Sequence, residues 1–111
     1  MTTLQQLAPC LQAEVLTAND NQDITGCYIS DLLSDVLAHA GPGVLWITVQ
    51  THHTVVSVAA TKDCSAVLFT CGRKPVPDVI AEAEEQGIAL LTTKLTTYEA
   101  AGQLWEAGIR P

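Results

Sequence analysis

Apolar residues along the chain gather into three continuous runs, and these runs are the first guide to its fold. They span Val44 to Val49, Ala66 to Thr70 and Ile88 to Thr92, with polar residues only near their ends. A strand with one solvent-exposed face alternates apolar and polar residues, whereas a strand that is covered on both faces is apolar throughout. The runs therefore predict buried, neighbouring strands of a parallel sheet.

Segments with helical periodicity separate these runs. Ser30 is a good N-cap for a helix that Gly41 and Pro42 end. Thr51 is the predicted cap of a second helix, which runs to about Ala60. The residues expected to face the core are Leu32, Leu33, Val36, Leu37 and Ala40 in the first helix, and Val55, Val56 and Ala59 in the second.

Two further helices are predicted in the second half of the chain. Pro77 falls in the first turn of one of them, and Gly87 closes it. Thr96 and Glu99 have the spacing of a capping box that opens the last helix, which runs to about residue 107. Its expected core contacts are Tyr98, Ala101, Leu104 and Trp105.

The N-terminal part is less regular. A short helix over residues 2–8 is predicted from a Thr2–Gln5 capping box, with Pro9 as its end. Residues 13–17 predict a short edge strand, 19–23 a polar surface loop, and 26–29 a brief extended piece. From residue 31 onward helices and strands alternate. The expected fold is one α/β domain over residues 1–111, in three layers, with a mostly parallel sheet flanked by helices.

Composition narrows the function. Apolar residues make up 48% and charged residues 15%, which indicates a packed domain and not a disordered chain. A net charge of −7 argues against partners with phosphate backbones and against anionic membrane surfaces. No apolar run reaches the roughly 20 residues of a membrane span, and the N-terminus does not resemble a signal peptide. We therefore expect a cytoplasmic protein that binds neither nucleic acid nor membrane.

The four cysteines form no Cys-x-x-Cys pair and match no zinc spacing, so they predict buried free thiols and no metal site. Redox or metal chemistry is the alternative. They stand at positions Cys10, Cys27, Cys64 and Cys71.

Candidate binding residues lie where the three apolar strands end. If the strands are parallel, their polar tails meet at one edge of the sheet, where helix N-termini favour anions. The alternative is that these side chains only cap helices and strand ends. The candidate ligand-binding residues are Thr51, His52, His53, Thr70, Cys71, Gly72, Thr92 and Thr93.

Catalytic motifs are absent from the sequence. Gly72 and Lys74 do not have the spacing of a phosphate-binding P-loop, and there is no Gly-x-Ser-x-Gly nucleophile turn. His52 and His53 have no acidic partner nearby in the sequence. An enzyme that uses His52 or Cys71 is thus the third alternative, no cofactor is expected, and no catalytic residue is assigned.

Several segments together resemble the DRTGG domain family, small α/β domains similar to the N-terminal domain of HPr kinase/phosphorylase. They are residues 26–33, 43–48, 68–72 followed by Pro75, and 82–91. In the family the strand before the Pro-containing loop ends in Thr-Gly-Gly, whereas here Cys71 replaces the first glycine. An Asp-Arg pair typical of some members is also replaced, by residues 51–53.

The resemblance implies a regulatory, ligand-sensing or dimer-forming accessory domain without kinase activity, because the P-loop of the kinase lies in a separate domain. Two hypotheses follow: a non-catalytic regulatory domain that self-associates as a homodimer, and a protein that binds a small anionic, nucleotide-like ligand at the strand ends. Val44 and Trp46 are the residues expected to form a sticky apolar face, with a core position as the alternative for Trp46.

Overall fold

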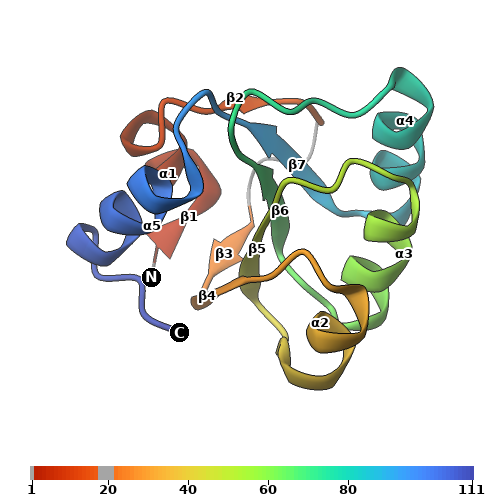
Figure 1. The fold of residues 1–111 in the computed structure, drawn as a ribbon, viewed down its shortest axis with the longest axis horizontal. Helices are drawn as coiled ribbons and strands as arrows, with labels where there is room; N and C mark the ends of the chain where they lie inside the picture. Colours follow the sequence, from red (N-terminus) through yellow and green to blue (C-terminus); the bar gives the residue numbers. More distant parts are fainter. Residues whose placement is uncertain (1, 18–21) are drawn as a thin grey trace.

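A five-stranded sheet forms the centre of the molecule in the computed structural model, which describes residues 2–17 and 22–111 (Figure 1). Its strand order is β2-β7-β6-β5-β4. Strands β4 to β7 are parallel, and β2 pairs with β7 in the antiparallel direction at one edge. The strands are β2 (Glu14–Val15), β4 (Gly26–Ile29), β5 (Val44–Thr48), β6 (Ala66–Phe69) and β7 (Ala89–Thr92).

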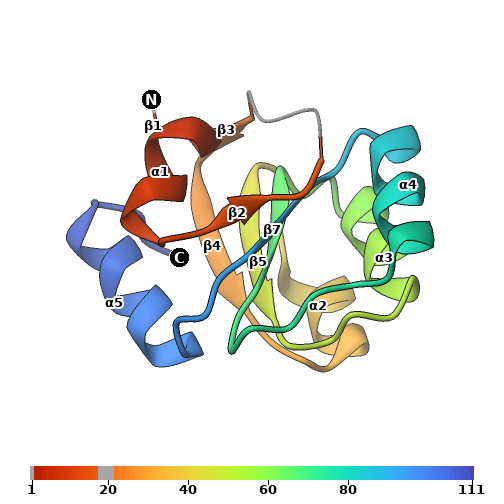
Figure 2. The same cartoon turned by 90° about the horizontal axis from the view of Figure 1, so that it is seen from above.

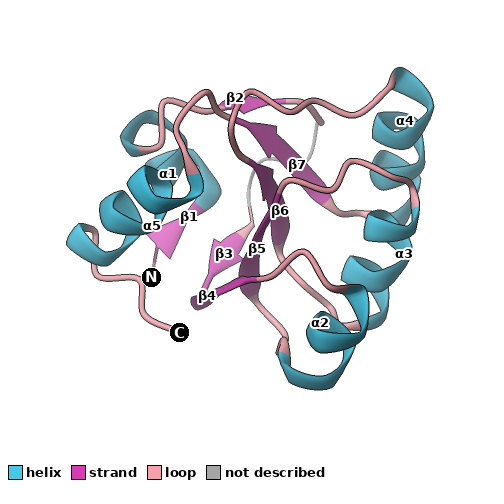
Figure 3. Cartoon of the chain, viewed as in Figure 1, coloured by secondary structure: helices cyan, strands magenta, loops and turns pink. Residues whose placement is uncertain are grey.

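Helices cover both faces of this sheet, as Figures 1 and 2 show from two directions. One face carries α1 (Leu4–Cys10) and α5 (Thr97–Glu106). The other carries α2 (Leu33–His39), α3 (Thr54–Thr61) and α4 (Pro77–Gln86). A separate two-stranded ribbon pairs β1 (Thr2–Thr3) with β3 (Asp23–Ile24), drawn in magenta in Figure 3. The three-layer α/β prediction is confirmed. None of the described helices is long and apolar enough to cross a membrane.

Side chains of the central strands alternate between two cores, one on each side of the sheet. Leu45, Ile47 and Leu68 pack under α1 and α5, whereas Trp46 and Phe69 pack under α2, α3 and α4. All five have no exposed surface. The absence of polar alternation in the sequence thus reflects burial on both faces.

Trp46 belongs to the core and does not contribute to an exposed apolar surface. Its indole Nε1 donates a hydrogen bond of 2.9 Å to the carbonyl of Ser30, which satisfies the buried polar group. The prediction of an apolar face at Val44 and Trp46 is therefore wrong, and the core alternative for Trp46 is confirmed.

Two helices bury only part of the face that was predicted. Helix α5 buries Ala100 and Leu104, while Tyr98 and Trp105, predicted core contacts, are 88% and 59% exposed. Val36 of α2 and Ala40 after it are buried as predicted, and Leu33 packs against the same core. The prediction is wrong for Leu37 and for Leu32, the N-cap residue, which are 43% and 64% exposed.

Several helix boundaries are shifted by one or more residues. The first capping box is formed by Thr3 and Gln6 instead of the predicted pair, and α1 continues one residue beyond Pro9. Helix α2 has Leu32 at its N-cap, and the hydroxyl of Ser30 accepts a hydrogen bond from the Leu32 N–H. The cap formed by Thr96 and Glu99 and the starting position of Pro77 are confirmed. Residues 19–21 of the predicted polar loop lie outside the described residues.

Replacement of Leu68 by alanine tests the central position of β6. Because Leu68 is completely buried, Leu68→Ala is expected to lower the free energy of unfolding by about 2–5 kcal/mol. Leu32→Ala, at a leucine that is 64% exposed, is the matched control and is expected to cost less than about 0.5 kcal/mol. Urea unfolding curves of the two variants measure the difference, and equal losses would contradict the assigned core.

Candidate functional site

The carboxyl ends of the parallel strands meet at one edge of the sheet. Thr48 at the end of β5 is level with Phe69 of β6, which in turn is level with Thr92 of β7. The loops that follow these strands therefore leave the sheet side by side. The convergence predicted from the three apolar runs is confirmed.

A pocket of about 300 Å³ lies at this edge, where the loops after β6 and β7 meet the start of β2. It brings together three of the predicted ligand-binding residues, Gly72, Thr92 and Thr93. The rest of its lining comes from Gln12, Glu14, Lys74 and Lys94. The pocket is thus built from two adjacent strand tails and the antiparallel edge strand.

Thr51, His52 and His53 follow β5 and do not line this pocket. The Nδ1 of His52 accepts a hydrogen bond of 3.3 Å from the backbone N–H of Thr54 and lies 3.1 Å from its hydroxyl. His52 therefore supplies the side-chain cap of α3, whose N-cap residue is His53 and not the predicted Thr51. The ring centroids of His52 and His53 lie 4.3 Å apart, with the ring planes tilted by 30°.

The threonine hydroxyls of the strand tails already have partners within the chain. The hydroxyls of Thr70 and Thr97 lie 2.7 Å apart, and Thr93 donates to the carbonyl of Leu11 at 2.7 Å. Thr92 donates to the backbone carbonyl of Arg73. These hydrogen bonds hold the loops after β6 and β7 in place, which agrees with the structural alternative for these threonines.

Positive charge is concentrated at this edge of the molecule. Three of the five basic residues of the chain, Arg73, Lys74 and Lys94, stand in the two loops after β6 and β7, and all three are exposed. The Lys74 ammonium lies 3.7 Å from the Glu14 carboxylate. Both side chains are more than half exposed, so this ion pair is weak and can open to admit another anion.

The sequence did not indicate three of the residues that line the pocket, namely Gln12, Glu14 and Lys94. Lys74 entered the sequence analysis only through the comparison with a phosphate-binding P-loop. Lys94 directly follows the predicted Thr92–Thr93 pair, so a count of basic residues near strand ends is the signal that finds it. Glu14 enters the site because β2 pairs with β7 in the antiparallel direction. A two-residue strand carries no sequence pattern that specifies that partner.

Cys71 and Gly72 form the turn after β6 and have left-handed backbone angles, with φ of +60° and +72°. Their N–H groups donate to the carbonyls of Leu95 and Thr93, both at 2.8 Å, so the turn is fixed against the neighbouring loop. Left-handed geometry is natural for glycine and costs energy in a residue with a Cβ. Cys71 is also exposed, as is Cys10, so the prediction of buried thiols is wrong for these two cysteines.

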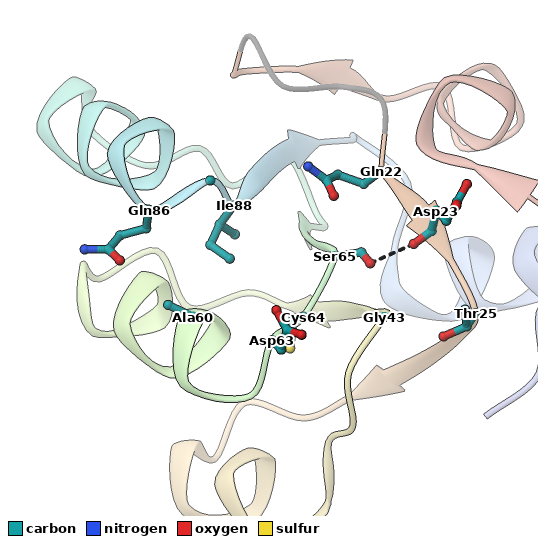
Figure 4. Close-up of a pocket in the computed structure, with 11 residues that line it drawn as sticks. Gln22, Asp23, Thr25, Gly43, Ala60, Asp63, Cys64, Ser65, Gln86 and Ile88 are labelled. Carbon is teal, nitrogen blue, oxygen red and sulfur yellow. Dashed lines mark hydrogen bonds between the residues drawn. The ribbon is translucent and has the colours of Figure 1, made fainter.

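A second hollow, of about 610 Å³, lies at the opposite edge of the sheet (Figure 4). Asp23 and Asp63 line it, together with the carboxyl ends of α3 and α4, which carry the negative poles of those helices. Cys64 lies there too, and burial, followed by the Asp63 charge, raises the pKa of its thiol to about 11. This hollow repels anions. Among the described residues no cluster of three His, Cys, Asp or Glu is placed to hold a metal ion.

Comparison with known proteins identifies the family. The family model of the DRTGG domain matches residues 6–107. The chain belongs to the DRTGG domain family. A similar solved structure is the regulatory region, with CBS and DRTGG domains, of a Clostridium perfringens pyrophosphatase, at a TM-score of 0.75 and 16% identity. The likeness covers 93% of this chain and 46% of the other, so this DRTGG chain spans about half of that protein region. No match to a curated protein was found.

Substitution of Cys71 by glycine tests the strain in the DRTGG-type turn. Restoring the glycine removes a left-handed Cβ, partly offset by the greater freedom of glycine in the unfolded chain. Cys71→Gly is expected to raise the free energy of unfolding by up to about 1 kcal/mol. Cys10→Gly, at the end of α1, is the control and is expected to destabilise. A melting temperature of Cys71→Gly below that of the natural chain would contradict the idea that Cys71 is strained.

Proposed function

We propose that this DRTGG domain is a non-catalytic regulatory domain that binds a small anionic ligand in the pocket at the ends of β6 and β7. The observation that carries the proposal is the concentration of Arg73, Lys74 and Lys94 beside that pocket in a chain with a net charge of −7. Such a local positive field attracts an anion that the rest of the surface repels.

The residues of the pocket suit a phosphate group. Lys74 and Lys94 supply two ammonium groups from neighbouring loops, and Gly72 has no side chain between a ligand and the backbone. The size of about 300 Å³ is at the lower end for ligand pockets, which begin at roughly 300 Å³. A phosphorylated metabolite or the phosphate end of a nucleotide fits this space and chemistry.

A nucleotide is the first ligand class to test. The similar pyrophosphatase regulatory region was solved with its activator, diadenosine tetraphosphate. That ligand belongs to the other protein, whose chain also contains CBS domains. It supports the choice of adenine nucleotides as probes for this chain.

A regulatory role agrees better with the site than catalysis does. His52 and Cys71, the residues of the enzymatic alternative, follow different strands, and the Nδ1 of His52 is engaged with Thr54. The likeness to the N-terminal domain of HPr kinase/phosphorylase, a cytoplasmic location and the one-domain organisation stay predictions.

Self-association as a homodimer is a second proposed property. It is supported by Tyr98 and Trp105, two large aromatic side chains on α5 that remain 88% and 59% exposed. Exposed aromatic residues that gather on one surface are typical of protein–protein contacts.

Replacement of Lys94 tests the pocket directly. Lys94→Gln is expected to weaken binding of adenosine triphosphate or diadenosine tetraphosphate about tenfold, because a charged hydrogen bond contributes roughly 1.5–3 kcal/mol. Lys62→Gln, at the far end of α3, is the matched control and should leave the affinity unchanged. Titration calorimetry with inorganic phosphate as a third probe measures the change. Equal affinities of the two variants, or no binding by the natural chain, would contradict the proposal.

Replacement of Glu14 should have the opposite effect. Its carboxylate lies 3.7 Å from Lys74 and competes with an incoming anion for the same ammonium group. Glu14→Gln is therefore expected to tighten binding of the same nucleotides by a few-fold, with a smaller gain at high salt because screening weakens exposed charges. Weaker binding by this variant would place the anion elsewhere.

A further inference from the structure

Helix α5 carries an exposed stripe with large residues at its ends and small residues between them. Tyr98, Ala101, Gly102 and Trp105 follow each other at intervals of three, one and three residues, so they share one side of the helix. This side is turned away from Ala100 and Leu104, which attach α5 to the sheet. A shallow groove runs along the stripe. We propose that this α5 stripe is the surface on which a second copy of the chain docks, with the two α5 helices antiparallel.

The spacing of the stripe is self-complementary. In an antiparallel pair with its two-fold axis between Ala101 and Gly102, Tyr98 of each copy lies opposite Trp105 of the other. Ala101 lies opposite Gly102, and these small residues let the two helices approach closely. Aromatic pairs at both ends and small residues at the centre fill such a contact without a gap.

The helix dipoles favour the antiparallel arrangement. In an antiparallel pair the positive end of each α5 lies beside the negative end of the other, whereas a parallel pair places like ends together. Glu99 and Glu106 are exposed and flank the stripe, so they lie at the rim of the contact.

The available area approaches the lower bound for a stable contact. A buried aromatic side chain covers roughly 150–250 Å², and Tyr98 and Trp105 are 88% and 59% exposed, so the four in the pair contribute on the order of 450–750 Å². The backbone at the small residues and the flanking side chains bring the total toward the roughly 1,200 Å² at which specific interfaces begin. The guanidinium of Arg110 stacks on the Trp105 ring at 3.8 Å and holds it in place, yet the ring stays 59% exposed.

The substitution Gly102→Leu places a bulky side chain at the proposed two-fold axis. A Cβ at this helical position meets no atom within 4 Å, so the folded chain accommodates the change. Ala81→Leu adds the same side chain to the exposed surface of α4, behind the other face of the sheet, and is the matched control. Sedimentation equilibrium should show dimers for the natural chain and for Ala81→Leu. For Gly102→Leu the dissociation constant should be at least tenfold higher.

Tryptophan fluorescence provides an independent readout of the same contact. Trp46 has no exposed surface, so a change in emission on dilution of the natural chain reports on Trp105. Emission should shift to longer wavelength as dimers dissociate, and it should not change on dilution of Gly102→Leu. A natural chain that is monomeric at several hundred micromolar overturns the inference. So does a dimer that Gly102→Leu leaves intact while Leu32→Ser, on the other exposed apolar surface, disrupts it.

This inference rests on the proposed self-association and is separable from the proposed ligand site. Nucleotide binding is measured on Gly102→Leu as well, and the pocket residues are unchanged in that variant. A chain that dimerises through α5 and binds no anion contradicts the ligand proposal alone. A chain that binds nucleotide and stays monomeric contradicts the α5 contact alone.

Discussion

The apolar character of β5, β6 and β7 on both of their faces is the constraint from which the rest of the structure follows. Strands of this kind need a helical layer on each side, and short connections can supply those layers only if each strand is followed by a helix that crosses back. The strands then run in the same direction, and their carboxyl ends meet at one edge. The candidate pocket is a geometric consequence of how the chain buries its apolar residues.

The same arrangement makes the two edges of the sheet electrically different. Helices α3 and α4 end at the edge where the strands begin, next to Asp23 and Asp63. The basic loops with Arg73, Lys74 and Lys94 lie at the edge where the strands end. The helix dipoles and the side-chain charges therefore reinforce each other: both are negative at the edge where the strands begin and positive at the edge where they end. The edge near the start of α4 is thus favourable for an anion, although the chain as a whole is acidic.

The sequence predicts those features that depend on local pattern. The buried strands, the Thr96–Glu99 cap and the convergence of the strand tails all follow from periodicity and capping chemistry. Features that depend on tertiary context do not follow. Tyr98 and Trp105 look like core residues because they are large and apolar, but the side of α5 that meets the sheet is chosen by the small Ala100 and by Leu104. The contribution of Glu14 to the pocket depends on the pairing of β2, which two residues cannot specify.

The pocket and the α5 stripe are neighbours, and this links the two proposals physically. Gln12 lines both the pocket and the groove on α5, and Lys94 stands in the pocket three residues before α5 begins. A second copy docked on the α5 groove would also contact Gln12, so the proposed dimer contact and the proposed ligand site would share this residue. Any effect of the ligand on dimerisation would then be matched by an equal effect of dimerisation on ligand affinity, because coupling between two binding events is reciprocal.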